Sequence, residues 1–202
     1  MGLFRWLLVS SEIKRGENVD TRQALGFQEF ADKFFDYLGD GYGFKKTSSD
    51  VYCVQFDSKD RYVKIVHGRN EIDLFIGHKT VGKEIRINDV IQYSGCMVNQ
   101  WAWNASTRHS VEEGSRRLAQ LLKDVGGEAL TGSVEYFEDV YNMSTQLQYA
   151  VEKQQELADM EERAHEAWIK KDYKRVVVNY ESYENLLNEV QQKRLELARR
   201  KI

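Results

Sequence analysis

The sequence predicts an α+β protein, with an antiparallel β-meander packed against an N-terminal helix and followed by a long C-terminal α-helical hairpin. Three observations predict this fold class. Apolar residues recur at three- and four-residue steps over residues 21–38, the spacing of one helix face. Residues 42–87 instead form short runs rich in aromatic and β-branched residues, which are typical of strands. The helical spacing returns over residues 133–201.

The N-terminal helix is expected to turn one apolar face to the core and to end at Gly39 and Gly41. Its apolar positions are Phe27, Phe30, Ala31, Phe34, Phe35 and Leu38.

The strand block is expected to form four or five strands joined by short turns, which favour antiparallel hairpins. Its runs are residues 42–47, 51–56, 62–67, 72–76 and 84–87. Alternation places Ile72, Leu74 and Ile76 on one face of the sheet, and we expect that face to meet the helix of residues 21–38.

A short helix is predicted over residues 88–93, and a longer one begins at Ser110, which forms an S-x-x-E capping box with Glu113. The pair Gly126-Gly127 ends that helix and is the most natural break in the chain. We therefore expect an α+β domain over residues 1–127 and a helical hairpin extension over residues 128–202.

The predicted hairpin over residues 133–201 has two apolar seams. One seam runs from Val134 through Leu147 to Trp168, and the other runs from Tyr173 to Leu197. A single hairpin cannot bury both seams, so it must lie on the sheet domain, pair with a second copy or hold a partner.

Composition excludes several classes of protein. The net charge is −3 and neither half has a basic surplus, which argues against a nucleic-acid binder. No apolar stretch approaches the length of a membrane span, and the run within Met1–Ser10 is interpreted as a strand or a packed terminal arm. Cys53 and Cys96 lie far apart, which favours a reducing compartment and a cytoplasmic protein.

No catalytic motif, metal site or cofactor site is recognisable, so we expect a protein that is not an enzyme. The four histidines lack metal-ligand spacing, and Cys53 is interpreted as a small buried filler in a strand. Gly39, Gly41 and Gly43 follow a helix and open a strand, the reverse of a dinucleotide-binding loop. An enzyme would need a pocket that gathers His109, Cys96 and a carboxylate.

Binding residues are expected among aromatic and acidic side chains. Trp101 and Trp103 form an aromatic cluster with Tyr93, in a segment with weak secondary-structure signals. Aromatic residues dominate protein-binding hot spots, but they also seal sheet edges, and the two alternatives stay open here. Glu71 and Asp73 supply the complementary charge.

Two resemblances also favour binding. The segment from Arg61 to Tyr93, with a strand ending at Ile76-Gly77 and a helix carrying Asp89, resembles small uncharacterised bacterial proteins, some of them similar to immunity proteins of toxin systems. Residues 164–187 resemble a single tetratricopeptide-type helical pair, although Val176 and Val177 stand where small residues are usual.

These features predict a cytoplasmic bacterial protein-interaction protein, in the form of an immunity-like inhibitor that acts by occlusion. The partner is expected to be a protein, with no role for nucleic acid or membrane. The alternative is a structural protein that forms a homo-oligomer through residues 133–201.

Overall fold

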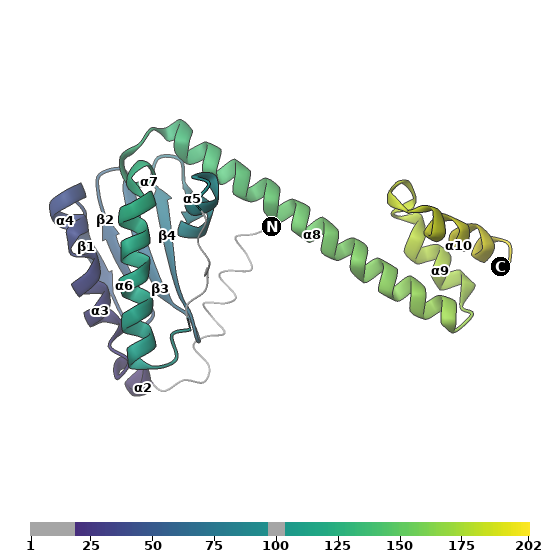
Figure 1. Cartoon of the computed structure of the whole chain (residues 1–202), viewed down its shortest axis with the longest axis horizontal. Helices are drawn as coiled ribbons and strands as arrows, with labels where there is room; N and C mark the ends of the chain where they lie inside the picture. The colour runs from purple at the N-terminus through teal and green to yellow at the C-terminus, as the bar shows by residue number, and fades with distance from the viewer. Residues whose placement is uncertain (1–18, 97–103) are drawn as a thin grey trace. The chain divides into compact units, whose positions relative to one another are not determined.

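The computed structural model describes residues 19–96 and 104–202, so the apolar run of Met1–Ser10 lies outside the described residues. The chain forms two compact units (Figure 1), which divide between Ser144 and Thr145. This division lies further along the chain than the expected boundary after residue 127. We call residues 1–144 unit 1 and residues 145–202 unit 2.

Unit 1 contains a five-stranded antiparallel sheet in which every strand pairs with its neighbour in sequence. The strands are β1 (Lys45–Ser49), β2 (Cys53–Asp57), β3 (Arg61–His67), β4 (Ile72–His78) and β5 (Lys83–Arg86). The predicted fold class, an α+β protein with an antiparallel meander, is therefore confirmed.

Two helices cover one face of the sheet, α3 (Phe27–Phe35) and α6 (Arg108–Val125). They lie side by side in Figure 1, where α3 contacts β2 and α6 contacts β4. Ile72, Leu74 and Ile76 are buried on this face in one core with both helices, as the alternation predicted. The core also takes in α5 (Ile87–Tyr93) and α7 (Gly127–Thr131).

The expected helix over residues 21–38 is divided into three pieces, so that prediction is wrong in its continuity. They are α2 (Val19–Gln23), α3 and α4 (Tyr37–Tyr42). Gly26 adopts a left-handed backbone with φ 71°, which interrupts the helix before α3. Gly39 and Gly41 lie inside α4, and Gly43 ends it with φ 70°. The Gly43 N–H donates to the Gly39 carbonyl, and the Phe44 N–H donates to the Leu38 carbonyl, each at 3.0 Å.

The start of α6 also differs from its prediction. Thr107, not Ser110, is the N-cap residue, and its hydroxyl accepts a hydrogen bond from the Ser110 N–H at 3.2 Å. Ser110 occupies the third helical position of the capping box, where its hydroxyl accepts from the Thr107 N–H. Glu113 instead pairs with Arg116 at 2.9 Å and with Arg117.

Unit 2 begins within α8 (Val134–Ile169) and continues with α9 (Tyr173–Glu181), the 3-10 turn η2 (Glu184–Leu186) and α10 (Glu189–Arg199). The long helix and its returning partner confirm the predicted hairpin, but the returning arm is broken. Asn188 caps α10 by accepting from the N–H groups of Val190 and Gln191, and α10 packs against α9.

Glu161 on α8 joins the three helices of unit 2. Its carboxylate accepts hydrogen bonds from Tyr180 on α9 at 3.0 Å and from Gln191 on α10 at 2.7 Å. Arg194, also on α10, donates to the other carboxylate oxygen at 3.1 Å. This polar cluster borders an apolar core of Met160, Ala164, Ala167, Val176, Val177, Tyr180, Leu187, Leu195 and Ala198.

A close contact between β3 and β4 predicts the effect of one substitution. The Tyr62 ring lies over Gly77, so that a Cβ on Gly77 would stand 1.9 Å from a ring carbon, and Glu84 holds the Tyr62 hydroxyl at 3.0 Å. We expect Gly77→Ala to lower the free energy of unfolding by about 1–3 kcal/mol, measured by urea denaturation.

The matched control is Gly41→Ala, because a Cβ on Gly41 would meet nothing within 4 Å. This variant should be as stable as the wild type or slightly more stable. Equal stability of the Gly77→Ala variant and the wild type would contradict the prediction.

Candidate interaction surfaces

The predicted aromatic cluster is only partly described, because Trp101 and Trp103 lie outside the described residues. Tyr93, the last residue of α5, is 40% exposed. Its ring packs edge-on against Tyr136 at the start of α8, with the ring centroids 5.3 Å apart. Tyr93 therefore offers one exposed aromatic edge whose position is fixed by a second ring.

Glu71 directly precedes β4 and Asp73 is its second residue, in a region of mixed charge. Asp73 points away from the α3 and α6 side of the sheet, where its carboxylate lies 3.8 Å from the Arg86 guanidinium. Burial raises the pKa of Asp73, Arg86 opposes that shift, and the negative charges of Glu71 and Asp89 add to it. The negative charge of Glu71 thus acts on Asp73, the second acidic residue predicted from the sequence. Asp89 acts on it in the same way, although the sequence analysis had given Asp89 only a place in a helix.

The enzyme alternative required a pocket that gathers Cys96, His109 and a carboxylate. Cys96 and His109 are both exposed, and within the described residues no hydrogen bond joins them. His67, the last residue of β3, is buried, with its Nε2 2.9 Å from the Ala105 carbonyl oxygen and its ring against Phe27. Within the described residues, no three His, Cys, Asp or Glu side chains are arranged to hold a metal ion.

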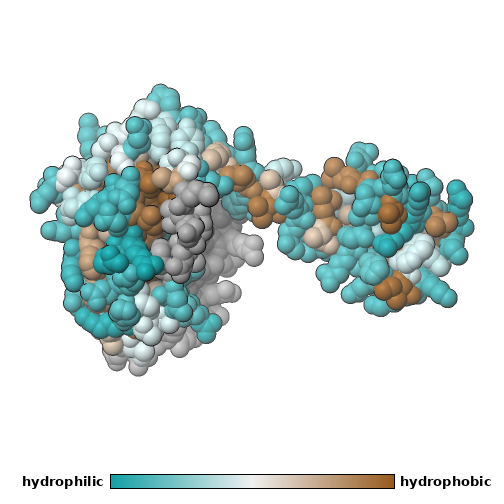
Figure 2. Space-filling view, in the orientation of Figure 1, coloured by the Kyte–Doolittle hydropathy of each residue, from teal (hydrophilic) through white to brown (hydrophobic). Residues whose placement is uncertain are grey.

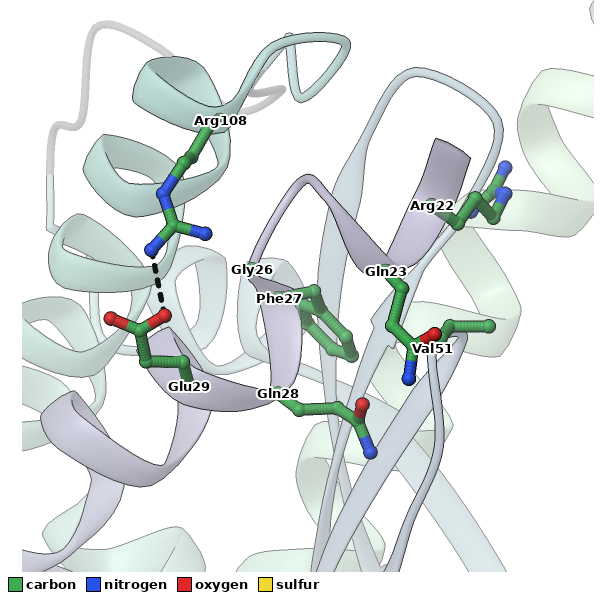
Figure 3. A pocket seen from close by; sticks show the side chains of 8 residues that line it. All are labelled: Arg22, Gln23, Gly26, Phe27, Gln28, Glu29, Val51 and Arg108. Atoms are coloured by element: carbon green, nitrogen blue, oxygen red, sulfur yellow. Dashed lines mark hydrogen bonds and ion pairs between the residues drawn. The ribbon is translucent and has the colours of Figure 1, made fainter. Parts of the chain in front are cut away.

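A pocket of about 220 Å³ lies where α3 begins (Figure 3). Arg22 and Arg108 line it, but both cations already have partners. Arg22 is buried and donates to the carbonyls of His67 at 3.1 Å and Gly68 at 3.0 Å. Arg108 pairs with Glu29 at 2.7 Å, so the pocket offers little charge to a ligand.

Unit 2 exposes most of the large apolar side chains that lie on the described surface. In unit 1 the exposed ones are Tyr93 and Val134. Figure 2 shows apolar patches in brown among the charged side chains over the C-terminal helices. The exposed apolar residues of unit 2 are Leu147, Tyr149, Val151, Ile169, Val178, Leu186, Val190, Leu197 and Ile202.

Val190 and Leu197 share one face of α10, because they are seven residues apart, and both are exposed, at 60% and 44%. Leu186 in η2 precedes them and is 56% exposed. We call Leu186, Val190 and Leu197 the α10 patch. Sequence analysis placed both residues in the apolar seam from Tyr173 to Leu197, but it did not predict that Asn188 begins a separate helix on which both are exposed.

The raised pKa of Asp73 predicts a pH-dependent effect of Asp73→Asn. The folded state holds the Asp73 proton more tightly than the unfolded state, so this group lowers stability as pH rises from its ordinary value of 3.8 through the raised pKa. The stability of Asp73→Asn relative to the wild type should therefore increase with pH across that window, in urea denaturation at a series of pH values.

Asp40→Asn, at an exposed position of α4, is the control for removing a carboxylate. A stability difference between Asp73→Asn and the wild type that stays constant or falls with rising pH would refute the assignment.

The two thiols are expected to differ in reactivity. Burial raises the pKa of Cys53 to about 11, whereas Cys96 is exposed. Since the thiolate is the reactive form, an aromatic disulfide reagent at pH 8 should modify Cys96 quickly and Cys53 only after unfolding in urea. Cys96→Ser should remove the fast phase, and two fast-reacting thiols in the folded wild type would show the prediction to be wrong.

Comparison with known proteins adds no relationship to this geometry. No family model, curated protein or solved structure matches the chain. Each helix within residues 19–96 and 104–202 is too short or too polar to cross a bilayer. The resemblances to immunity proteins and to a tetratricopeptide pair therefore stay predictions, and the functional argument rests on the surfaces described above.

Proposed function

We propose that this chain is a cytoplasmic bacterial protein-interaction protein that acts by binding a protein partner, with the α10 patch as a main contact surface. The observation that carries the proposal is the concentration of exposed apolar side chains on unit 2. Contiguous exposed apolar surface is costly in water and is typical of surfaces that bind other proteins.

The small core of unit 2 supports this proposal. Its three helices enclose a core of nine buried apolar residues, yet six large apolar residues from Ile169 to Ile202 remain exposed. The Glu161 hydrogen bonds already hold α8, α9 and α10 together. The exposed residues are therefore not needed to close the unit, and they are available to a partner.

An immunity-like inhibitor is the more specific form of this proposal. Tyr93, Glu71 and Asp73, together with Trp101 and Trp103 outside the described residues, would meet a partner with a basic surface. Occlusion of that kind needs a fixed aromatic anchor and complementary charge, and the contact between Tyr93 and Tyr136 fixes one such ring. If the complex kept its affinity after Trp101→Ala and Trp103→Ala, the immunity-like form of the proposal would be wrong.

The test of the α10 patch compares Val190→Ser/Leu197→Ser with the wild type. Tagged protein is exposed to lysate of its own host, the captured protein is identified, and its affinity is then measured with purified components. Removing two apolar contacts of an interface centre should weaken binding about tenfold or more. The control is Val134→Ser, which changes a residue of unit 1 that is 40% exposed.

Helical circular dichroism should show that all three proteins are folded, because the substituted residues are exposed. Unchanged affinity of Val190→Ser/Leu197→Ser, or the absence of any captured protein, would contradict the proposed role of the α10 patch.

A further inference from the structure

One face of α8 within unit 2 carries a stripe of exposed residues at alternating three- and four-residue steps. This spacing keeps them on a single side of the helix, and at 1.5 Å per residue the stripe is about 32 Å long. We call it the α8 stripe, and its members are Tyr149, Glu152, Glu156, Asp159, Arg163 and Glu166, with Lys170 directly after the last residue of α8.

The N-terminal half of the α8 stripe is acidic. Glu152, Glu156 and Asp159 follow Tyr149, which is 68% exposed. The bonds of Glu152 and Asp159 within the helix come from neutral amides, Gln148 at 2.9 Å and Gln155 at 2.7 Å. Only Glu156 has a cationic neighbour, Lys153, at 3.5 Å.

The C-terminal half of the α8 stripe borders a groove of about 350 Å³ between α8 and α9. Its lining residues are Arg163, Glu166, Ala167, Lys170, Asp172, Arg175, Val178 and Asn179. Three of these are cations and two are acids, so the groove has a positive balance.

The two acids of the groove each have a cation beside them. Glu166 lies 3.4 Å from Lys170, and Asp172 lies 4.0 Å from Arg175. Arg163 makes no ion pair with any residue in the described part of the chain. It stands in the α8 stripe next to the acidic half, where it can meet a carboxylate from outside.

We propose that unit 2 binds a second copy of this chain, with the acidic half of the α8 stripe in one copy lying antiparallel against the groove of the other. The proposal rests on the protein-interaction function but uses a different face from the α10 patch. A two-fold axis across the paired helices makes both contacts at once, because each copy supplies one acidic half and one groove.

The apolar residues of these two surfaces are also complementary. Tyr149 lies at the acidic end of the α8 stripe, and the groove offers the buried side chain of Ala167 and the 68%-exposed Val178. In the antiparallel pairing the Tyr149 ring meets this apolar part of the groove. A foreign acidic peptide would fill only the groove, whereas a second copy covers the acidic half as well.

Charge reversal tests the proposal with the full-length chain. Glu152→Lys/Glu156→Lys places two cations in the acidic half of the stripe, and Arg163→Glu/Lys170→Glu leaves the stripe without a cation. Light scattering after size exclusion should give the wild type twice the 23.6 kDa of one chain. Each double variant should be a monomer, and an equimolar mixture of the two should regain the doubled mass.

The matched controls separate this proposal from the proposed function. Val190→Ser/Leu197→Ser should keep the doubled mass, and that mass should fall as sodium chloride screens the charges. A wild type that stays at 23.6 kDa throughout a concentration series, or double variants that associate like the wild type, would overturn the proposal. A wild type that is monomeric but still captures a partner through the α10 patch would count against the second copy alone.

Discussion

The hydrogen bonds of the buried Arg61 guanidinium are the constraint that joins the sheet of unit 1 to the helices that follow it. Arg61 is 4% exposed at the start of β3, and it donates to the carbonyl oxygens of Glu128 at 3.3 Å and Ser133 at 3.4 Å, and to those of Ala129 and Gly132. The last carbonyls of a helix lack partners within it, and a buried charge needs compensation. Arg61 satisfies both requirements, because it caps the end of α7 while backbone dipoles surround its charge.

This arrangement also fixes where α8 begins. The segment between α7 and α8 is attached to β3, and Phe137 and Val140 in the first turns of α8 are fully buried in the core of unit 1. The Phe137 ring lies under the Arg61 guanidinium, 5.8 Å from ring centroid to guanidinium carbon, and it packs edge-on against His78. The core of unit 1 therefore extends past residue 127, the boundary expected from Gly126-Gly127. Residues after both glycines, among them Phe137 and Val140, still pack into that core.

The sequence predicted the order of the elements because strand alternation and helical spacing are local signals. The alternation of Ile72, Leu74 and Ile76 gave the correct inward face. The positions at which the predicted helices are interrupted were harder to find from the sequence. Gly26 looked like an ordinary helical position, and only its left-handed backbone shows that the helix is interrupted there. Arg61 lies two residues before the buried Val63 on the same strand, so strand alternation places it on the same inward face. This alternation was the signal in the sequence that Arg61 is buried.

The candidate surfaces were harder to predict, because they depend on which helix faces stay uncovered. Analysis of apolar spacing alone joined Tyr173 to Leu197 into one arm, whereas Asn188 begins a separate helix that covers part of the expected seam. The α8 stripe has a clear three- and four-residue period, but its members are charged and were not part of an apolar seam. Charge periodicity along α8 would have indicated it.

The carboxylate of Glu161 has a consequence for how unit 2 can change over evolution. Tyr180, Gln191 and Arg194 all donate to it from two different helices. Replacing Glu161 with a neutral residue would leave donors without an acceptor on both helices in a single step. A substitution of Glu161 is therefore expected to need compensating changes at Tyr180, Gln191 and Arg194, although these residues are far from it in the sequence.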